Sequence, residues 1–209
     1  MLSERIPATE QIGDWLDELL APTEDAIKHD RTTTVKRVSL GDQELIVKRY
    51  NARSRWHVIK RALRQTRAQR CWEMSHRFQQ SGLNVAAPLL MHERRWGPFK
   101  GNAYFVTEFL RGKELLILLP EMNSADQQLV AQQIQQAFAI MQREQLTHGD
   151  MKASNLLWVD DQLVFVDLDA ASIHQSTLSW QRSHARDLKR FMKNWRGNPE
   201  LLELFSDYS

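Results

Sequence analysis

The spacing of apolar residues divides the chain into a strand-rich first half and a helix-rich second half. Residues 9–20 repeat apolar side chains at i, i+3, i+4 and i+7, which predicts a short amphipathic helix. Residues 55–81 are expected to form a second helix, and residues 124–145 a long third helix with an apolar face. A final helical stretch is expected from about residue 180 to residue 205.

Short runs of β-branched, aromatic and alternating residues predict the strands. Residues 84–90, which contain Pro88, are expected to form a loop or an edge strand. Turn residues separate the members of two hairpins, at 41–43 and at 160–162. The order of these elements is typical of an α+β protein. The predicted strands are 26–28, 35–40, 44–50, 104–109, 156–159 and 163–167.

Composition limits the class of protein further. With 209 residues, 42% of them hydrophobic, the chain can form one domain or two small lobes that share a cleft, and widespread disorder is excluded. The single cysteine, Cys71, excludes an intramolecular disulfide. No apolar run approaches the ~20 residues that cross a bilayer, and the acidic N-terminus does not resemble a secretory signal. We therefore expect a cytoplasmic protein.

Residues with catalytic chemistry gather around the second hairpin. The segment His148-Gly149-Asp150-Met151-Lys152-Ala153-Ser154-Asn155 precedes its first strand, and Asp167-Leu168-Asp169 follows its second strand. An antiparallel hairpin would place Asn155 and Asp167 at the same end, where an amide oxygen and a carboxylate can share Mg²⁺. Asp150, in the loop before the hairpin, is the expected acceptor of a proton from an attacking hydroxyl.

Lys152 completes the set that phosphoryl transfer needs, because its ammonium group would lie near the γ-phosphate. The alternative is a structural hairpin with a few capping carboxylates, since Asp and Asn are common in loops. The joint spacing of Asp150, Lys152, Asn155 and Asp167 favours the catalytic interpretation.

These motifs resemble the protein-kinase-like superfamily. His148-Gly149-Asp150 with Asn155 is similar to its catalytic loop, and Asp167-Leu168-Asp169 is similar to its metal-binding motif. Val47-Lys48-Arg49-Tyr50-Asn51 and the later Trp72, Gly82 and Pro88 resemble the Kdo/WaaP family of lipopolysaccharide core kinases. The resemblance implies a bilobal fold, with a small β-rich N-lobe in residues 1–110 and a mainly helical C-lobe in residues 111–209.

The resemblance also implies a role for each matching residue. Asp150 corresponds to the catalytic base, and Asn155 and Asp167 to the Mg²⁺ ligands. Lys48 corresponds to the lysine that holds the α- and β-phosphates of ATP, although a strand lysine that faces water is the plain alternative. Glu108-Phe109-Leu110 corresponds to the hinge, so the backbone of Glu108 and Leu110 is expected to bind adenine.

Three departures from the kinase pattern stand out. The loop 29–34 contains no glycine, whereas protein kinases cover the phosphates with a glycine-rich loop. Cys71 occupies the place where heptose kinases of the family often carry the helix glutamate that pairs with the lysine. Glu73 is the nearest carboxylate, but two residues further on it points to another helix face. No Ala-Pro-Glu segment follows Asp169, which disfavours a regulated protein kinase.

Basic residues are concentrated between Lys48 and Arg70, where nine Lys and Arg residues occur without any acid. Such a stretch is either a solvated face or an attraction site for an anionic substrate or an acidic membrane surface. We expect peripheral contact with the cytoplasmic face of the inner membrane through Arg53–Arg70. RNA would be a rival ligand, but no aromatic stacking platform accompanies the charges, so no nucleic acid is expected.

The resemblance therefore implies an ATP- and Mg²⁺-dependent kinase that phosphorylates a heptose or Kdo hydroxyl of the lipopolysaccharide inner core. A kinase for a protein or another small molecule is the first alternative, and a non-catalytic nucleotide-binding protein is the second. The sequence leaves open which sugar is modified, the oligomeric state and the role of the C-terminal helix.

Overall fold

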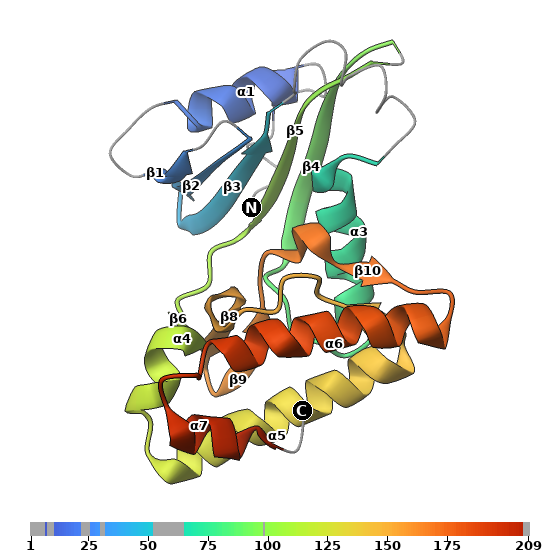
Figure 1. Ribbon diagram of the computed structural model, residues 1–209. Helices are drawn as coiled ribbons and strands as arrows, with labels where there is room; N and C mark the ends of the chain where they lie inside the picture. The colour runs from blue at the N-terminus through green and yellow to red at the C-terminus, as the bar shows by residue number, and fades with distance from the viewer. Residues whose placement is uncertain are drawn as a thin grey trace. The chain divides into compact units, whose positions relative to one another are not determined.

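The computed structural model describes residues 7, 11–21, 26–29, 32–51, 65–97 and 99–206 (Figure 1). The chain forms two compact units, and each is described by itself. Unit 1 comprises Met1–Glu73 with Ala87–Phe109, and unit 2 comprises Met74–Ala86 with Leu110–Ser209. The predicted α+β class is confirmed, while the predicted lobe boundary between residues 110 and 111 stays a prediction.

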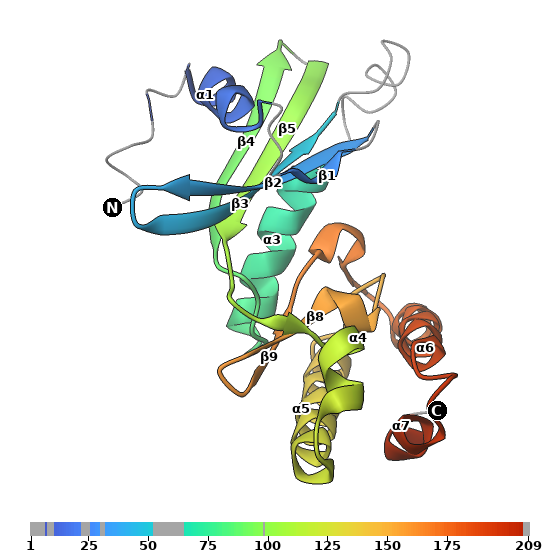
Figure 2. The ribbon, with the colours of Figure 1, turned by 90° about the vertical axis from the view of Figure 1, so that its left-hand side faces the viewer.

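Unit 1 is built on one antiparallel sheet with strand order β1-β2-β3-β5-β4 (Figure 2). A tight turn joins β2 to β3 at Gly41, whose φ of 64° suits glycine. Pro88 begins the edge strand β4, a position where the missing N–H of proline is tolerated. The strands are β1 (Ala26–His29), β2 (Thr33–Leu40), β3 (Gln43–Tyr50), β4 (Pro88–Trp96) and β5 (Phe99–Glu108).

The two faces of this sheet carry separate apolar clusters, as alternation along a strand requires. Leu16 of helix α1 (Ile12–Leu19) packs with Val47 and Tyr104. Ala68 and Cys71 of helix α3 (Arg67–Gln80) pack with Phe105, whose side chain alternates with that of Tyr104. The sheet therefore has an apolar cluster on each face.

Unit 2 is mainly helical and encloses its own core. Aromatic residues make up much of that core, with Phe191 packed edge-on against Phe138, Trp195 and Phe205. Two small sheets, β6-β8-β9 and β10-β7, accompany the helices. The elements are β6 (Lys113–Glu114), α4 (Leu115–Leu118), η3 (Leu119–Glu121), α5 (Ser124–Arg143), β7 (Leu146–Thr147), η4 (Ala153–Asn155), β8 (Leu156–Val159), β9 (Gln162–Phe165), η5 (Leu168–Ala170), β10 (Ser172–Ile173), α6 (Thr177–Lys193) and α7 (Pro199–Leu204).

Most predicted elements are confirmed, and one needs correction. The single helix expected from 180 to 205 is two helices, α6 and α7. Asn198 caps α7 by accepting a hydrogen bond from the Leu201 N–H, and Pro199 occupies the first turn, so the chain begins a new helix there. Of the helix expected over 55–81, residues 67–80 are helical, and residues 55–64 lie outside the described residues.

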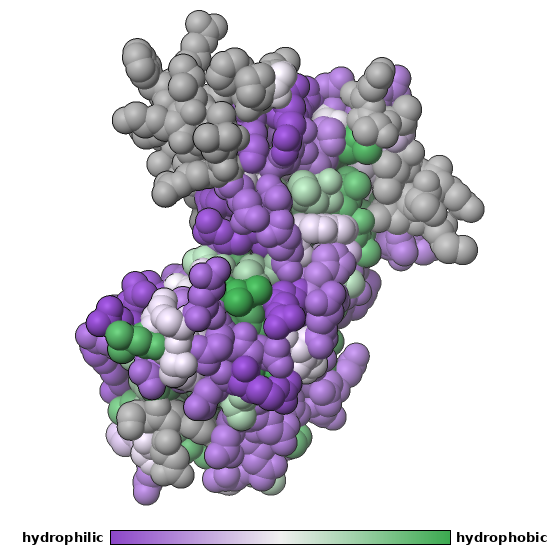
Figure 3. Space-filling model, turned by 90° about the vertical axis from the view of Figure 1, so that its right-hand side faces the viewer, coloured by the Kyte–Doolittle hydropathy of each residue, from purple (hydrophilic) through white to green (hydrophobic). Residues whose placement is uncertain are grey.

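Within the described ranges, no helix combines the length and the apolar character needed to span a bilayer. Figure 3 shows one face of the molecule, on which hydrophilic residues dominate and hydrophobic residues form small, separate patches.

Candidate active site

The hairpin of unit 2 brings two of the predicted site residues together. Strands β8 and β9 pair antiparallel, with Leu156 opposite Phe165 and Val159 opposite Gln162. At the end remote from the turn, the Val166 N–H donates to the Asn155 carbonyl at 3.0 Å. Asn155 and Asp167 therefore lie at the same end of the hairpin, as the sequence predicted.

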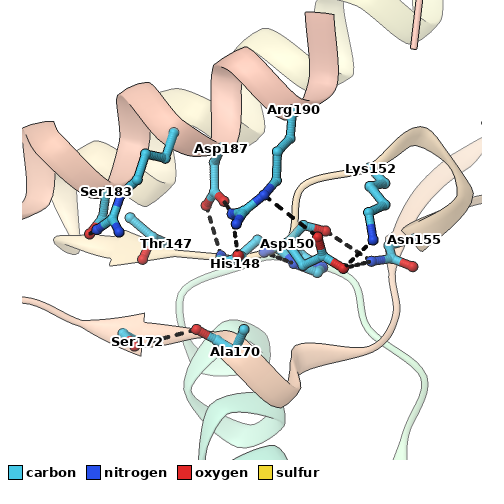
Figure 4. A network of polar contacts seen from close by, with 12 residues as sticks. Thr147, His148, Asp150, Lys152, Asn155, Ala170, Ser172, Ser183, Asp187 and Arg190 are labelled. Carbon is cyan, nitrogen blue, oxygen red and sulfur yellow. Dashed lines mark hydrogen bonds and ion pairs between the residues drawn. The ribbon is translucent and has the colours of Figure 1, made fainter. Parts of the chain in front are cut away.

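The loop before the hairpin fixes Asp150 against the other candidate residues (Figure 4). The Asn155 Nδ2 donates to the Asp150 carbonyl oxygen at 2.8 Å and lies 3.5 Å from its Oδ2. The Lys152 ammonium donates to the same Oδ2 at 2.8 Å. Asp150, Lys152 and Asn155 thus form one polar cluster in which the Asp150 carboxylate is held but still partly exposed.

Gly149 allows the loop to pass close to the segment that follows Asp167. Its φ is +79°, and an added Cβ would overlap the Ala170 carbonyl oxygen. Both the dihedral angle and the contact exclude any residue with a side chain unless the backbone moves. This packing explains why position 149 requires glycine.

Helix α6 holds the loop from the other side, through residues that the sequence analysis did not select. The fully buried Asp187 accepts a hydrogen bond at its Oδ2 from the Gly149 N–H at 2.8 Å. Arg190 donates from Nη1 to the Gly149 carbonyl oxygen at 2.5 Å, and its Nε lies 3.7 Å from the Asp150 Oδ1. Both backbone polar groups of Gly149 are therefore bound by side chains of α6.

Arg190 also lies within ion-pair distance of both the Asp150 and the Asp187 carboxylates. Its Nη1 lies 3.5 Å from the Asp187 Oδ1, an ion-pair distance without a hydrogen bond. Asp187 lies 38 residues after Gly149, and no local motif marks it. The one sequence signal was its position as the sole acid in an otherwise basic helix.

His148 lies beneath the loop and is fully buried. Its Nε2 is 3.0 Å from the Val166 carbonyl oxygen, so Nε2 carries the proton, and Nδ1 can accept the Asp150 N–H at 3.4 Å. Burial lowers the pKa of His148, although the negative charges of Asp187, Asp167 and Asp150 oppose that shift. A neutral His148 thus connects the loop to the hairpin end.

Asp167 has left-handed backbone dihedral angles, with φ 61° and ψ 55°. Aspartate adopts this conformation more readily than most residues, but at a cost of about 1–2 kcal/mol. Such outliers persist where the surrounding structure holds them and are enriched at functional sites. The strain at Asp167 is consistent with a carboxylate that must face a ligand.

The donor set at the hairpin end suits magnesium. The Asn155 Nδ2 donates to the Asp150 carbonyl, which leaves the Asn155 Oδ1 to coordinate a metal ion. The Asp167 carboxylate would be a second oxygen ligand. Mg²⁺ is usually bound by one or two carboxylates together with waters and substrate phosphates. Among the described residues, no group of three or more His, Cys, Asp or Glu side chains could hold a metal ion.

The remaining candidates belong to unit 1, except for Leu110. Lys48 lies in the central strand β3, between Val35 of β2 and Phe105 of β5. The Glu108 N–H donates to the Ala87 carbonyl at 3.1 Å, and the Glu108 carboxylate accepts the Ala87 N–H at 2.7 Å. Leu110 begins the second part of unit 2.

At the helix position where the sequence resemblance implies a glutamate, this chain has a cysteine. Cys71 is buried, with its sulfur 3.4 Å from the Tyr50 hydroxyl. Glu73 is exposed, and its two carboxylate oxygens accept hydrogen bonds from the side chains of Gln65 and Gln69 at 2.9 Å. The local bonds of Glu73 are therefore to neutral amides of its own helix and of the residues just before it.

Comparison with known proteins identifies first the fold and then the family. The fold is that of kinase-like proteins: it is similar to a solved structure of WaaP in complex with acyl carrier protein, with a TM-score of 0.61, 17% sequence identity, and coverage of 93% of this chain and 86% of that one. No curated protein matches the chain at a significant level. The model of the lipopolysaccharide kinase (Kdo/WaaP) family matches residues 17–207, and the chain belongs to that family.

Membership of this family makes the protein a kinase, a phosphotransferase with an alcohol group as acceptor. The protein-kinase-like fold that the sequence predicted is confirmed.

Proposed function

We propose that the protein transfers the γ-phosphoryl group of ATP, with Mg²⁺, to a heptose or Kdo hydroxyl of the lipopolysaccharide inner core. The family supports a lipopolysaccharide-related substrate. The polar cluster of unit 2 supports the chemistry, because phosphoryl transfer depends on positioning and on charge stabilisation more than on covalent steps.

Asp150 orients the acceptor hydroxyl and accepts its proton. Its Oδ1 is the oxygen less engaged by Lys152, since the ammonium donates to Oδ2. Lys152 then stabilises negative charge on the phosphoryl group as it is transferred. This division gives each of the two residues a single task.

Asn155 and Asp167 are the proposed ligands of the metal ion. When bound, Mg²⁺ would neutralise charge on the phosphate oxygens. Lys48 is the proposed partner of the α- and β-phosphates, with Glu73 as the remaining candidate for a helix carboxylate. The backbone carbonyl of Glu108 and the backbone groups of Leu110 are the proposed adenine contacts, because the Glu108 N–H is already bonded to the Ala87 carbonyl.

The observation that carries this proposal is the position of Asn155. The Asn155 side-chain Nδ2 donates to the Asp150 backbone carbonyl. The Asn155 backbone carbonyl accepts a hydrogen bond from the N–H of Val166, the residue before Asp167. A purely structural hairpin would not require these three polar side chains at one end. The arrangement favours catalysis over the non-catalytic alternative.

The proposal is tested by phosphate transfer from labelled ATP to purified core oligosaccharide. Asp150→Asn should lower kcat by about 10²- to 10⁴-fold and leave nucleotide binding intact, because the amide keeps the shape but cannot accept the proton. Asp160→Asn, in the exposed turn between β8 and β9, is the matched control and should transfer normally. Equal activity in wild type and Asp150→Asn would refute the catalytic role.

Location is a separate proposal. We propose that the protein works at the cytoplasmic face of the inner membrane, with Arg53–Arg70 in contact with the acidic surface. Of that stretch, residues 53–64 lie outside the described residues. Arg67 is described, and its Nη1 donates to the Thr33 hydroxyl at 3.1 Å while its guanidinium lies over the Tyr50 ring. Neutralising Arg61, Arg64 and Arg67 together should weaken vesicle binding and its salt dependence.

A further inference from the structure

Helix α6 carries a row of exposed cations that the proposed chemistry does not use. Asp187, which is buried, is the only acidic residue in the helix. At about 100° per residue, the cations fall within a sector of roughly 100° on one side of the helix. We call this row the α6 basic face, and it comprises Arg182, Arg186, Lys189, Arg190 and Lys193.

Helix stability does not explain this arrangement. Cations near a helix C-terminus interact favourably with the macrodipole, which accounts for Arg190 and Lys193 in the last turn. Arg182 and Arg186 lie in the first two-thirds of the helix, where that benefit is absent. Like charges four residues apart also repel, as Arg182 and Arg186 do.

The cost of this repulsion is not offset by ion pairs. In the part of the chain that the structure describes, only Arg190 of the α6 basic face lies within ion-pair distance of a carboxylate. Arg186 instead donates to the Arg182 carbonyl at 3.2 Å and to the Ser183 hydroxyl at 2.8 Å, which holds its side chain along the helix. The basic face is therefore available to an anionic ligand.

The α6 basic face passes the proposed catalytic residue at Arg190, before its last member, Lys193. Arg190 reaches the Asp150 carboxylate and the Gly149 carbonyl, so a ligand bound along the helix would extend to the loop (Figure 4). The distance along the axis from Arg182 to Arg190 is about 12 Å, longer than a single sugar ring. A saccharide with several anionic groups fits this length and this charge.

We infer that the α6 basic face binds the carboxylate and phosphate groups of the acceptor saccharide and so determines which acceptor is used. Arg182 and Arg186 hold the part of the acceptor remote from the reaction. Arg190 is a positioning residue that links this surface to Asp150. The inference rests on the proposed function, since it names the surface that presents the sugar hydroxyl to that site.

A membrane surface and an acidic carrier protein are the other partners that a basic face could attract. The contact of Arg190 with Asp150 favours the acceptor, because neither of the other partners needs to approach the catalytic carboxylate. The similar structure holds WaaP in complex with acyl carrier protein. Acyl carrier protein is therefore the protein partner to include in the test.

The test compares the wild-type chain with the double variant Arg182→Gln/Arg186→Gln. Both residues are exposed, so the variant should fold with an unchanged melting temperature. Lys113→Gln/Arg143→Gln removes two exposed charges elsewhere in unit 2 and serves as the matched control. Equilibrium binding is measured with core oligosaccharide, with anionic phospholipid vesicles and with acyl carrier protein, at two salt concentrations.

The inference predicts that only oligosaccharide binding weakens in the double variant, by roughly tenfold at low salt and by less at high salt. KM for the oligosaccharide in the transfer reaction should rise by a similar factor while kcat stays the same. Unchanged oligosaccharide binding, or a loss confined to vesicles or carrier protein, would overturn it.

The same measurements separate this inference from the proposed function. A wild-type chain that binds the oligosaccharide through Arg182 and Arg186 but never phosphorylates it would refute the function and leave the binding surface standing. A double variant that binds and phosphorylates the oligosaccharide as the wild type does would refute the binding surface alone.

Discussion

The two units use their polar networks in different ways. In unit 1, Asp17 accepts hydrogen bonds from Arg49 at 2.9 Å and from the Tyr104 hydroxyl at 2.8 Å, which ties α1 to the sheet. In unit 2, one set of polar contacts converges on Gly149 and Asp150. The first network connects elements of the fold, whereas the second orients one carboxylate. The contacts that orient the proposed catalytic carboxylate therefore lie within unit 2.

The largest effect is expected when the Asp167 carboxylate is removed. Asp167→Asn should lower phosphate transfer by about 10³-fold, because the metal site loses a charged ligand while asparagine retains the left-handed backbone. Asp161→Asn is a matched control, since Asp161 has a φ of 59° in an exposed turn. Transfer rates at rising Mg²⁺ concentration provide the measurement. Equal losses in both variants would implicate the backbone and contradict a metal role.

A somewhat smaller effect is expected at Gly149. Gly149→Ala should lower transfer by about 10²-fold and unfolding free energy by roughly 2–4 kcal/mol, because the new Cβ meets the Ala170 carbonyl. Gly82→Ala is the control, since Gly82 also has a positive φ, of 88°, but has open space around it. It should lose only about 1 kcal/mol and little activity. Denaturant unfolding and transfer assays would show whether the two variants differ.

Asp187→Asn should reduce kcat by roughly tenfold and unfolding free energy by about 1–3 kcal/mol, since a buried acceptor of the Gly149 N–H is weakened. Nucleotide affinity should not change, because Asp187 touches the loop and not the proposed phosphate contacts. Separate kcat and nucleotide-binding measurements test this. A variant with normal kcat but reduced stability would make Asp187 purely structural.

The corresponding change in unit 1 should affect stability alone. Asp17→Asn should lower the unfolding free energy by about 1–2 kcal/mol, because the charged partner of Arg49 and Arg94 is lost. Transfer by the folded protein should remain normal, since these residues link α1 to the sheet. A large fall in kcat at a temperature where the variant is folded would contradict a purely structural role for Asp17.

The smallest effect is expected from pH. Burial lowers the pKa of His148 below the ordinary histidine value of 6.5, and burial also lowers the pKa values of His174 and His184. Between pH 6.5 and the folded-state pKa, the unfolded chain binds more protons than the folded chain. The unfolding free energy should therefore decrease as pH falls below about 6.5. Thermal unfolding between pH 5 and 8 tests this, and a rise in stability toward pH 5 would contradict it.

In unit 2, the sequence predicts the features that depend on residues close together along the chain. The distance from Asp150 to Asn155 is fixed within one loop, and the hairpin turn at Asp160 and Asp161 fixes the place of Asp167. Asp187 could not be found in this way, because its bond to Gly149 depends on how α6 packs against the loop. Only tertiary structure determines that contact.

In unit 1, alternation of apolar residues predicted strands β2 and β3 but could not reveal what a single strand lysine binds. Cys71 illustrates the limit on the helix side, since its burial against Tyr50 follows from packing and not from a motif. By contrast, the break between α6 and α7 could have been read from Asn198-Pro199, which is a typical helix start.

We propose above that the protein phosphorylates a sugar of the lipopolysaccharide core, with Asp150 of the loop 148–155 as the catalytic base. The most direct test is mass spectrometry of core sugars from a deletion strain that carries either the wild-type gene or Asp150→Asn. One core phosphate should be missing in the deletion strain, restored by the wild-type gene and not restored by Asp150→Asn. A core that keeps all its phosphates in the deletion strain would contradict the proposed phosphorylation of a core sugar. A core that regains the phosphate with Asp150→Asn would contradict the role of Asp150 as the base.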